Sequence, residues 1–245
     1  MQWIFISPHF DDVALSCGGL VWELTAAGNE VSIWTICGGI PSNAVHSAIV
    51  DTLHERWKSN NQAAIIRQQE DIRSCQNLNA DYMHFDLLDC IYRVNEVGSP
   101  LYPSEESLFG SIHPADLILI DHFAHILIHS IPKSAKVVCP LAIGNHVDHQ
   151  LSRQIIEKTG KAAWYYADFP YVMKNPGLLE DVTNKDWTSK AFKISSQGYQ
   201  AWLNSVVAHK SQISTFWKNK QKMNLDFRQY LHKFGGILLW RPKHK

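Results

Sequence analysis

The chain has 245 residues, 45% of them hydrophobic, and its 23 Lys and Arg residues balance its 23 Asp and Glu residues. A chain of this length can bury a large core as one α/β domain, so neither disulfides nor a structural metal is needed for folding. Its longest apolar runs are far shorter than the roughly 18 residues of a membrane span, and its first residues lack the basic and apolar regions of a signal peptide. Five cysteines without a C-x-x-C spacing predict buried free thiols and a reducing, cytoplasmic location.

The zero net charge conceals an uneven distribution. Residues 1–186 contain 12 basic and 22 acidic residues, whereas residues 187–245 contain 11 basic residues and one acidic residue. Such a basic segment either docks on the acidic body or recruits an anionic substrate, and no nucleic-acid partner is expected. Docking is favoured because apolar residues recur there at near-helical spacing. These residues are Trp202, Val206, Ile213 and Trp217.

Strands and helices alternate along residues 1–168. In chain order the pattern predicts a strand at 3–6, a helix at 13–27, a strand at 30–36, a long loop or helix entry through Asn61, a helix with Ile65, Ile72, Cys75 and Leu78 on one face, a strand at 82–85, a helix at 115–131, a strand at 136–139, a helix at 147–158 and a strand at 164–166. Pro114 suits the first turn of the helix at 115–131, although the apolar density there leaves a strand as the alternative.

This alternation implies right-handed βαβ crossovers and a mostly parallel sheet with helices on both faces. We therefore predict a single α/β domain, with residues 1–168 as its core and residues 169–245 as a basic extension packed on that core. In the first predicted helix, Cys17, Gly18 and Gly19 are small, which would let this helix lie close against the sheet.

Two predicted strand ends carry clusters of His and Asp. The segment SPHFDD at residues 7–12 follows the first strand, and GNHVDH at residues 144–149 follows the strand at 136–139. Ligands bind such sheets beyond the carboxyl ends of the strands, so the two segments are expected to meet. Two imidazoles and one carboxylate suffice to hold a catalytic Zn²⁺ with an open position for water, and a leftover carboxylate can then accept the proton of that water.

The two segments resemble the motifs of a known enzyme family. SPHFDDVALSCGG is similar to the first signature of the zinc-dependent LmbE-like or PIG-L-like N-acetylglucosaminyl de-N-acetylases, and GNHVDH is similar to their second signature. The resemblance extends from about residue 3 to residue 168 and implies a Rossmann-like fold. It implies a metal held by His9, Asp12 and His149. It also implies Asp11 as the general base and His146 as the group that stabilises the oxyanion.

Three further residues are candidates for supporting roles. A protonated His146 would be oriented by Asp148, since carboxylates commonly orient imidazoles. Arg67 and Asp89 also match elements of the family pattern and are predicted to bind substrate. For Arg67 an ion pair with Glu70 on the helix surface is the alternative. The ligand set also occurs in non-haem iron enzymes, so Fe²⁺ remains open beside Zn²⁺.

The predicted function is a metal-dependent hydrolase that removes an N-acyl group, expected to be acetyl, from a small amino-sugar substrate or its conjugate. Two alternatives are a metal amidase that acts on a thiol conjugate or another secondary amide, and a catalytically silent module that binds sugars or nucleotides. Asp11 argues against the silent module, because binding alone does not require the extra carboxylate. The sequence does not determine the oligomeric state.

Overall fold

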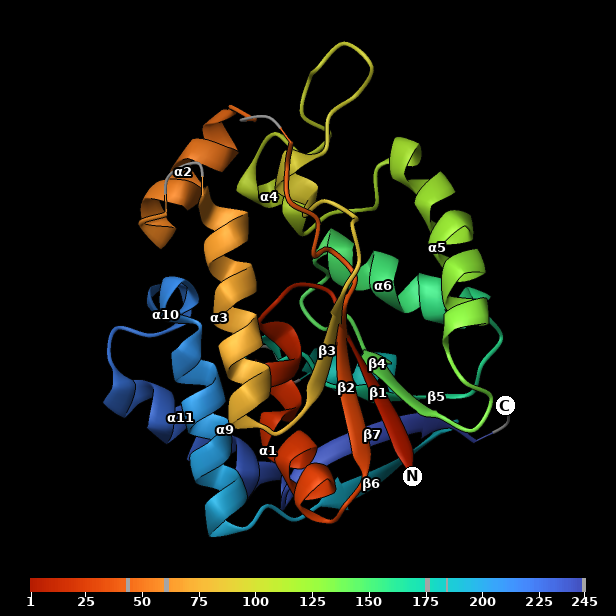
Figure 1. The fold of residues 1–245 in the computed structure, drawn as a ribbon, viewed down its shortest axis with the longest axis vertical. Coiled ribbons are helices and arrows are strands. Elements are labelled where there is room, and N and C mark those ends of the chain that lie inside the picture. The colour runs from red at the N-terminus through yellow and green to blue at the C-terminus, as the bar shows by residue number, and fades with distance from the viewer. Residues whose placement is uncertain (43–44, 60–61, 175–176, 184, 244–245) are drawn as a thin grey trace.

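The computed structural model describes the chain except for residues 43–44, 60–61, 175–176, 184 and 244–245. A seven-stranded sheet lies between two layers of helices (Figure 1). The strands are β1 (Gln2–Ser7), β2 (Glu30–Thr35), β3 (Asp81–His84), β4 (Lys136–Pro140), β5 (Ala163–Tyr166), β6 (Trp187–Phe192) and β7 (Ile237–Pro242). The α-helices are α1 (Asp12–Ala26), α2 (Ala48–Trp57), α3 (Ala63–Asn77), α4 (Glu105–Leu108), α5 (Leu117–Ser130), α6 (Val147–Lys158), α7 (Tyr171–Lys174), α8 (Gly177–Val182), α9 (Ser196–Ala208), α10 (Lys210–Phe216) and α11 (Lys220–Phe234).

The strand order of the sheet is β3-β2-β1-β4-β5-β7-β6. Strands β1 to β5 pair in parallel, and β7 runs antiparallel to both β5 and β6. In β1, Ile4, Phe5 and Ile6 are fully buried, as the central strand of a sheet covered on both faces requires. The predicted single α/β domain with a mostly parallel sheet is confirmed.

Helices cover both faces of the sheet. Helices α1, α3 and α9 pack together on one face, whereas α5 and α6 pack together on the other (Figure 1). Among the described residues, no helix is long and apolar enough to cross a membrane. All five cysteines are buried free thiols, as predicted.

The two glycines of α1 face α9 rather than the sheet. A Cβ atom added to Gly18 would lie 2.6 Å from Cδ1 of Trp202, and one added to Gly19 would lie 3.0 Å from another carbon of the same indole. The indole Nε1 of Trp202 also donates a hydrogen bond of 2.7 Å to the carbonyl oxygen of Ala14. The expectation that these glycines serve contact with the sheet is therefore wrong, because the indole of α9 occupies the space they leave.

The region between β2 and β3 differs from its prediction. Within the stretch expected to be a long loop or helix entry through Asn61, α2 forms, and Ser47 caps it by accepting a hydrogen bond from the backbone N–H of Val50. Asn61 itself lies outside the described residues. Helix α3 was predicted, but Ile65, expected on its buried face, is 46% exposed. The inner face of α3 is mostly polar, with Arg67, Glu70, Asp71 and Ser74 buried beside Cys75.

The C-terminal segment builds part of the sheet. Strand β7 lies between β5 and β6, and the sequence pattern predicts neither β6 nor β7. Trp202, Val206 and Trp217 are buried, in agreement with the predicted apolar face. Because β7 pairs with β5, residues of the basic segment continue the sheet that carries the two motifs.

Candidate active site

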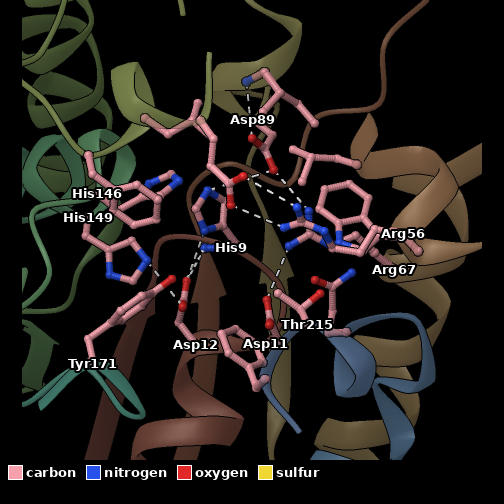
Figure 2. A pocket seen from close by; sticks show the side chains of 18 residues that line it. His9, Asp11, Asp12, Arg56, Arg67, Asp89, His146, His149, Tyr171 and Thr215 are labelled. Carbon is pink, nitrogen blue, oxygen red and sulfur yellow. Dashed lines mark hydrogen bonds and ion pairs between the residues drawn. The ribbon is translucent and has the colours of Figure 1, made fainter. Parts of the chain in front are cut away.

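The two motif segments meet at the edge formed by the carboxyl ends of β1 and β4. These strands are neighbours in the sheet, and the strand order changes direction between them, since β2 and β3 lie to one side and β5 to the other. Ligands of open α/β sheets bind at this switch point. A pocket opens there, and it contains seven of the eight predicted site residues (Figure 2). These are His9, Asp11, Asp12, Arg67, Asp89, His146 and His149.

Local backbone structure fixes the first motif. The hydroxyl of Ser7 accepts a hydrogen bond of 3.2 Å from the backbone N–H of Val13, and Asp12 accepts one of 2.8 Å from the backbone N–H of His9. Asp11 is the residue before the first turn of α1, and Asp12 is the first residue of that turn. Carboxylates are favoured at this end of a helix by the positive end of its dipole.

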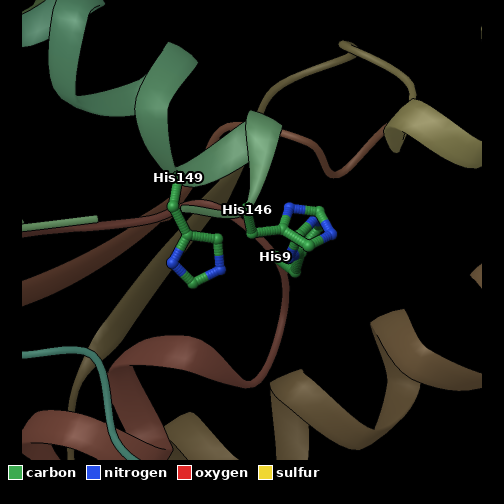
Figure 3. Close-up of side chains that lie close together, drawn as sticks. All are labelled: His9, His146 and His149. Carbon is green, nitrogen blue, oxygen red and sulfur yellow. The ribbon is translucent and has the colours of Figure 1, made fainter. Parts of the chain in front are cut away.

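Asp12 lies between two imidazoles. Its Oδ2 is 3.3 Å from Nδ1 of His9, and its Oδ1 is 3.3 Å from Nε2 of His149. Ligands about 2.0 to 2.1 Å from a tetrahedral zinc ion lie roughly 3.3 to 3.4 Å from one another. Each of the two distances between Asp12 and an imidazole thus matches a pair of ligands on one zinc ion, and Asp12 uses a different oxygen for each. His9, His146 and His149 also bring one ring nitrogen each within 4.8 Å of one another (Figure 3), so a second donor set includes His146.

In both His9 and His149, the ring nitrogen that faces away from Asp12 contacts a buried carboxylate. Nε2 of His9 is 2.9 Å from Asp148, and Nδ1 of His149 is 2.6 Å from Asp168. Such outer carboxylates fix the ring orientation of metal-binding histidines and the nitrogen that faces the metal. This arrangement leaves Nδ1 of His9 and Nε2 of His149 facing Asp12, which supports the donor set of His9, Asp12 and His149.

The position of Asp148 corrects one expectation. Its carboxylate contacts His9, the backbone N–H of Cys90 at 2.9 Å and Nη2 of Arg93. It therefore orients His9 rather than His146, because the first turn of α6 directs it under the pocket. Although burial favours the neutral acid, the charge of Arg93 and the hydrogen bond with His9 keep the pKa of Asp148 below its usual range.

His146 is held by the start of α6. It is the N-cap residue of that helix, and its Nδ1 accepts a hydrogen bond of 3.3 Å from the backbone N–H of Asp148. Burial, together with the nearby His9 and His149, lowers the pKa of His146 to about 3. The surroundings of His146 therefore favour its neutral form over the protonated form that was expected. A neutral ring whose Nδ1 accepts carries its proton on Nε2, and this N–H is the donor available to a ligand.

Arg67 joins the two carboxylates on the other wall of the pocket. Its Nη2 donates to Asp11 at 3.2 Å and its Nη1 donates to Asp89 at 3.0 Å, while its guanidinium lies 4.8 Å from the ring centroid of Trp57. Burial opposes ionisation of Asp89, but the charges of His9 and Arg67 lower its pKa. The alternative of a surface pair between Arg67 and Glu70 is wrong, because both side chains are buried and Glu70 accepts hydrogen bonds from Ser211.

Two charged residues of the site were missed by the sequence analysis. Asp168 follows β5, the strand next to β4, and an acidic residue at that strand end was a readable signal. Arg93 lies in an irregular segment and ion-pairs with Asp148 and Asp116. No local sequence pattern indicated a role for Arg93, because its ion-pair partners are distant in sequence.

The outer walls of the pocket come from elements that the sequence analysis did not connect with the motifs. They include four aromatic residues, Trp57 of α2, Phe109, Tyr171 of α7 and Phe216 of α10. Of the aromatic residues near β5, Tyr165, Tyr166 and Phe169 are buried in the core, and Tyr171 lines the pocket. At the mouth, Arg56 and Glu105 form a partly exposed ion pair of 3.3 Å.

The fold and the pocket together define an α/β enzyme with a His- and Asp-rich centre at the switch point of its sheet. The family model described as PIG-L, GlcNAc-PI de-N-acetylase, matches residues 4–159. The chain belongs to this family, as its two motifs indicated. It is a hydrolase that removes acetyl groups from amino sugars.

Known relatives are similar over most of the chain. A 2'-N-acetylparomamine deacetylase from Niallia circulans is 32% identical over 197 residues, which are 73% of this chain and 70% of that protein. A 2'-N-acetylparomamine deacetylase from Streptomyces fradiae is 26% identical over 179 residues, 69% of this chain and 57% of that protein. The solved zinc-inhibited form of a teicoplanin deacetylase has a TM-score of 0.83 at 23% identity and covers 99% of this chain and 97% of that chain. This last likeness supports the fold.

Proposed function

We propose that the chain is a zinc-dependent deacetylase that hydrolyses the N-acetyl group of an amino-sugar conjugate of the aminoglycoside type. The observation that carries this proposal is the placement of Asp12 at 3.3 Å from both Nδ1 of His9 and Nε2 of His149, with Asp11 lining the same pocket. The substrate class is suggested by the two relatives that act on 2'-N-acetylparomamine. Fe²⁺ is the alternative metal, because it accepts the same donors.

His9, Asp12 and His149 would hold the metal. When bound, zinc supplies a Lewis acid that polarises the amide carbonyl and lowers the pKa of water toward about 7. The carboxylates of Asp148 and Asp168 keep the two imidazoles in the orientation that this binding requires.

Asp11 accepts the proton of the attacking water in this mechanism. Arg67 donates to its Oδ1 at 3.2 Å, which fixes the carboxylate at the wall of the pocket. The water oxygen forms a bond to the amide carbon while the electron pair of the C=O double bond moves onto the oxygen. The electron pair on the oxygen then re-forms the C=O bond, and the C–N bond breaks as the nitrogen takes the proton held by Asp11. The products are a free amine and acetic acid, which releases its remaining proton to solvent as acetate.

His146 stabilises the oxyanion as a neutral donor. Its Nε2–H is available because Nδ1 accepts the hydrogen bond from the backbone of Asp148. A fixed donor aimed at developing negative charge in a buried site is an effective form of transition-state stabilisation. The N–H of a neutral imidazole is too weak an acid to protonate the leaving amine, so Asp11 is the proton donor for the leaving group.

The experiment that tests the proposal is acetate release from 2'-N-acetylparomamine and from a panel of N-acetylglucosaminides. Protein stripped with a chelator and then reloaded with Zn²⁺ or Fe²⁺ identifies the active metal. We expect turnover to disappear on stripping and to return with zinc. Failure of every N-acetyl substrate with the zinc-loaded protein would reject the proposed activity, whereas turnover restored by iron alone would reject only the metal.

A further inference from the structure

We infer that Tyr171 is a catalytic residue whose phenol O–H donates a hydrogen bond to the oxyanion formed from the substrate carbonyl. This inference rests on the proposed deacetylation and adds a second donor beside His146. Tyr171 is the first residue of α7, which follows β5, and it lies in the same pocket as His149 and Asp11.

Three aromatic contacts fix the ring of Tyr171. Its centroid lies 6.2 Å from that of His149, 6.1 Å from that of Phe109 and 6.5 Å from that of Phe216, each in an edge-on arrangement. In Figure 2 the ring extends from the chain toward Asp12 and His149, with its hydroxyl at the end nearest them. The hydroxyl is thus directed at the proposed metal ligands.

Gly144 provides the space for this ring. It adopts a φ of +95°, and a Cβ atom built on it would lie 2.9 Å from Cγ and 3.1 Å from Cβ of Tyr171. A larger residue at position 144 would displace the ring, besides being strained by the positive φ. Gly144 belongs to the same segment as His146 and His149, so the second motif itself holds Tyr171 in the pocket.

The hydroxyl of Tyr171 has no hydrogen-bond partner among the residues that the structure describes. Other phenols in and around the core do have one: Tyr102 donates to Asp116 at 2.7 Å, Tyr166 donates to the carbonyl oxygen of Ile6 at 3.0 Å, and Tyr92 is 2.7 Å from His54. Tyr171 is only half-buried, so its hydroxyl can be solvated in the open pocket. An unpaired donor beside the proposed metal ligands is therefore available for a substrate.

The chemistry requires a donor at this place. When the water oxygen bonds to the amide carbon, the carbonyl oxygen gains a full negative charge, and a hydrogen bond to it strengthens in the transition state. Tyr171 keeps its proton throughout, so the proton balance between water, Asp11 and the amine is unchanged. His146 and Tyr171 would then approach the oxyanion from α6 and from α7.

Tyr171→Phe tests this role, because it keeps the ring against Gly144 and removes only the hydroxyl. We expect kcat to fall by about 10²-fold, the smaller loss seen when one oxyanion donor is removed, with KM and metal content unchanged. A methylphosphonamide of glucosamine, whose tetrahedral phosphorus resembles the reacting carbon, should bind the variant more weakly by a similar factor. Tyr199→Phe is the matched control: its hydroxyl contacts Asn224 outside the pocket, and its kinetics should equal those of the wild type.

Three results would overturn the inference: unchanged kcat, a higher KM with unchanged kcat, or loss of the metal in Tyr171→Phe. The first result leaves no role in the reaction, the second indicates ground-state binding, and the third a structural role in the metal site. A wild-type protein that releases no acetate from any substrate would instead reject the proposed function. In that case equal binding of the phosphonamide by wild type and variant would reject the role of Tyr171 as well.

Discussion

The chemistry of the pocket depends on which ring nitrogen of each histidine is occupied by a hydrogen bond and which one faces the pocket. His9 directs Nε2 to Asp148, His149 directs Nδ1 to Asp168, and His146 uses Nδ1 to cap α6. The nitrogens that remain are Nδ1 of His9, Nε2 of His149 and Nε2 of His146. The first two face the carboxylate of Asp12, which supports the proposal that His9 and His149 bind the metal and that His146 acts as a donor.

His149→Ala should abolish metal binding. The substitution removes one of three donors and also leaves the buried carboxylate of Asp168 without its imidazole partner. Elemental analysis should find about one metal per wild-type chain and almost none in the variant. His125→Ala, which changes an exposed histidine of α5, should retain the wild-type content. A stoichiometric metal in His149→Ala would show that other residues hold it.

Asp11→Asn should affect turnover and spare the metal. A general base contributes typically about 10² to 10⁴-fold to the rate, and the amide keeps the size of the side chain and its acceptor oxygen for Arg67. Steady-state kinetics and metal analysis on the same preparation test this. Unchanged turnover would exclude Asp11 as the base, and a loss of metal would make it a ligand.

His146→Gln should lower kcat without changing the shape of the pH profile. Because the pKa of His146 is about 3, the ring is neutral at every pH above roughly 4, and no limb of the profile near neutral pH is due to its titration. We expect kcat to fall by about 10²-fold, with the remaining activity following the wild-type dependence on pH. The disappearance of a descending limb in the variant would restore a protonated His146 to the mechanism.

The sequence identified the residues at the centre of the pocket better than the partners that orient them. His9, Asp12 and His149 belong to short segments at strand ends, where sequence spacing determines proximity. The contact of Asp148 with His9 instead spans 139 positions, and that of Arg93 with Asp148 spans 55. Such contacts depend on how whole elements pack, which a local pattern does not encode.

At the scale of elements, helices and strands with a strong hydrophobic periodicity were predicted correctly. The predictions failed where buried residues are polar or where a strand pairs with a strand distant in sequence. The central strand β1 was recognised from its apolar residues alone. Helix α3 was recognised, but its inner face is polar because it borders the pocket and α10, where Glu70 binds Ser211. Strand β7 was missed because its place in the sheet is set by antiparallel pairing with β5 across more than 70 residues and with β6 across 45 to 55 residues.

The close approach of α1 and α9 yields a prediction for stability. Gly18→Ala would place a Cβ atom 2.6 Å from Cδ1 of Trp202 and 3.0 Å from Oγ of Ser205. Overpacking of this kind costs about 1 to 3 kcal/mol, which outweighs the gain of up to about 1 kcal/mol that alanine gives in a helix.

Urea unfolding should therefore show a lower free energy of unfolding for Gly18→Ala. Gly177→Ala serves as the control, since a Cβ atom there has no neighbour within 4 Å among the described residues. A variant at Gly18 that is more stable than the wild type would show that α9 moves aside easily.

At the scale of the whole molecule, the division of charge does not coincide with a division of structure. Residues 187–245 carry the basic surplus, yet they supply two strands of the sheet and three helices, one of which lines the pocket through Gln212, Thr215 and Phe216. Removing this segment would expose the edge of β5 and open the pocket. The segment is therefore held by apolar burial and strand pairing as well as by charge.

The last prediction separates docking through apolar burial from recruitment of anionic substrates. Lys218, Lys220 and Lys222 are exposed, and Lys222 pairs with Asp226 of its own segment. Their joint replacement by Gln should change the free energy of unfolding by no more than about 0.5 kcal/mol per site. By contrast, Trp202→Ala, which empties a fully buried position, should cost about 3 to 5 kcal/mol.

In the triple lysine variant, KM for a neutral N-acetylglucosaminide and for a nucleotide-linked N-acetyl sugar should both equal the wild-type values at low and at high salt. A KM that rises only for the nucleotide-linked sugar, and only at low salt where charges are poorly screened, would instead show that the basic segment attracts substrate.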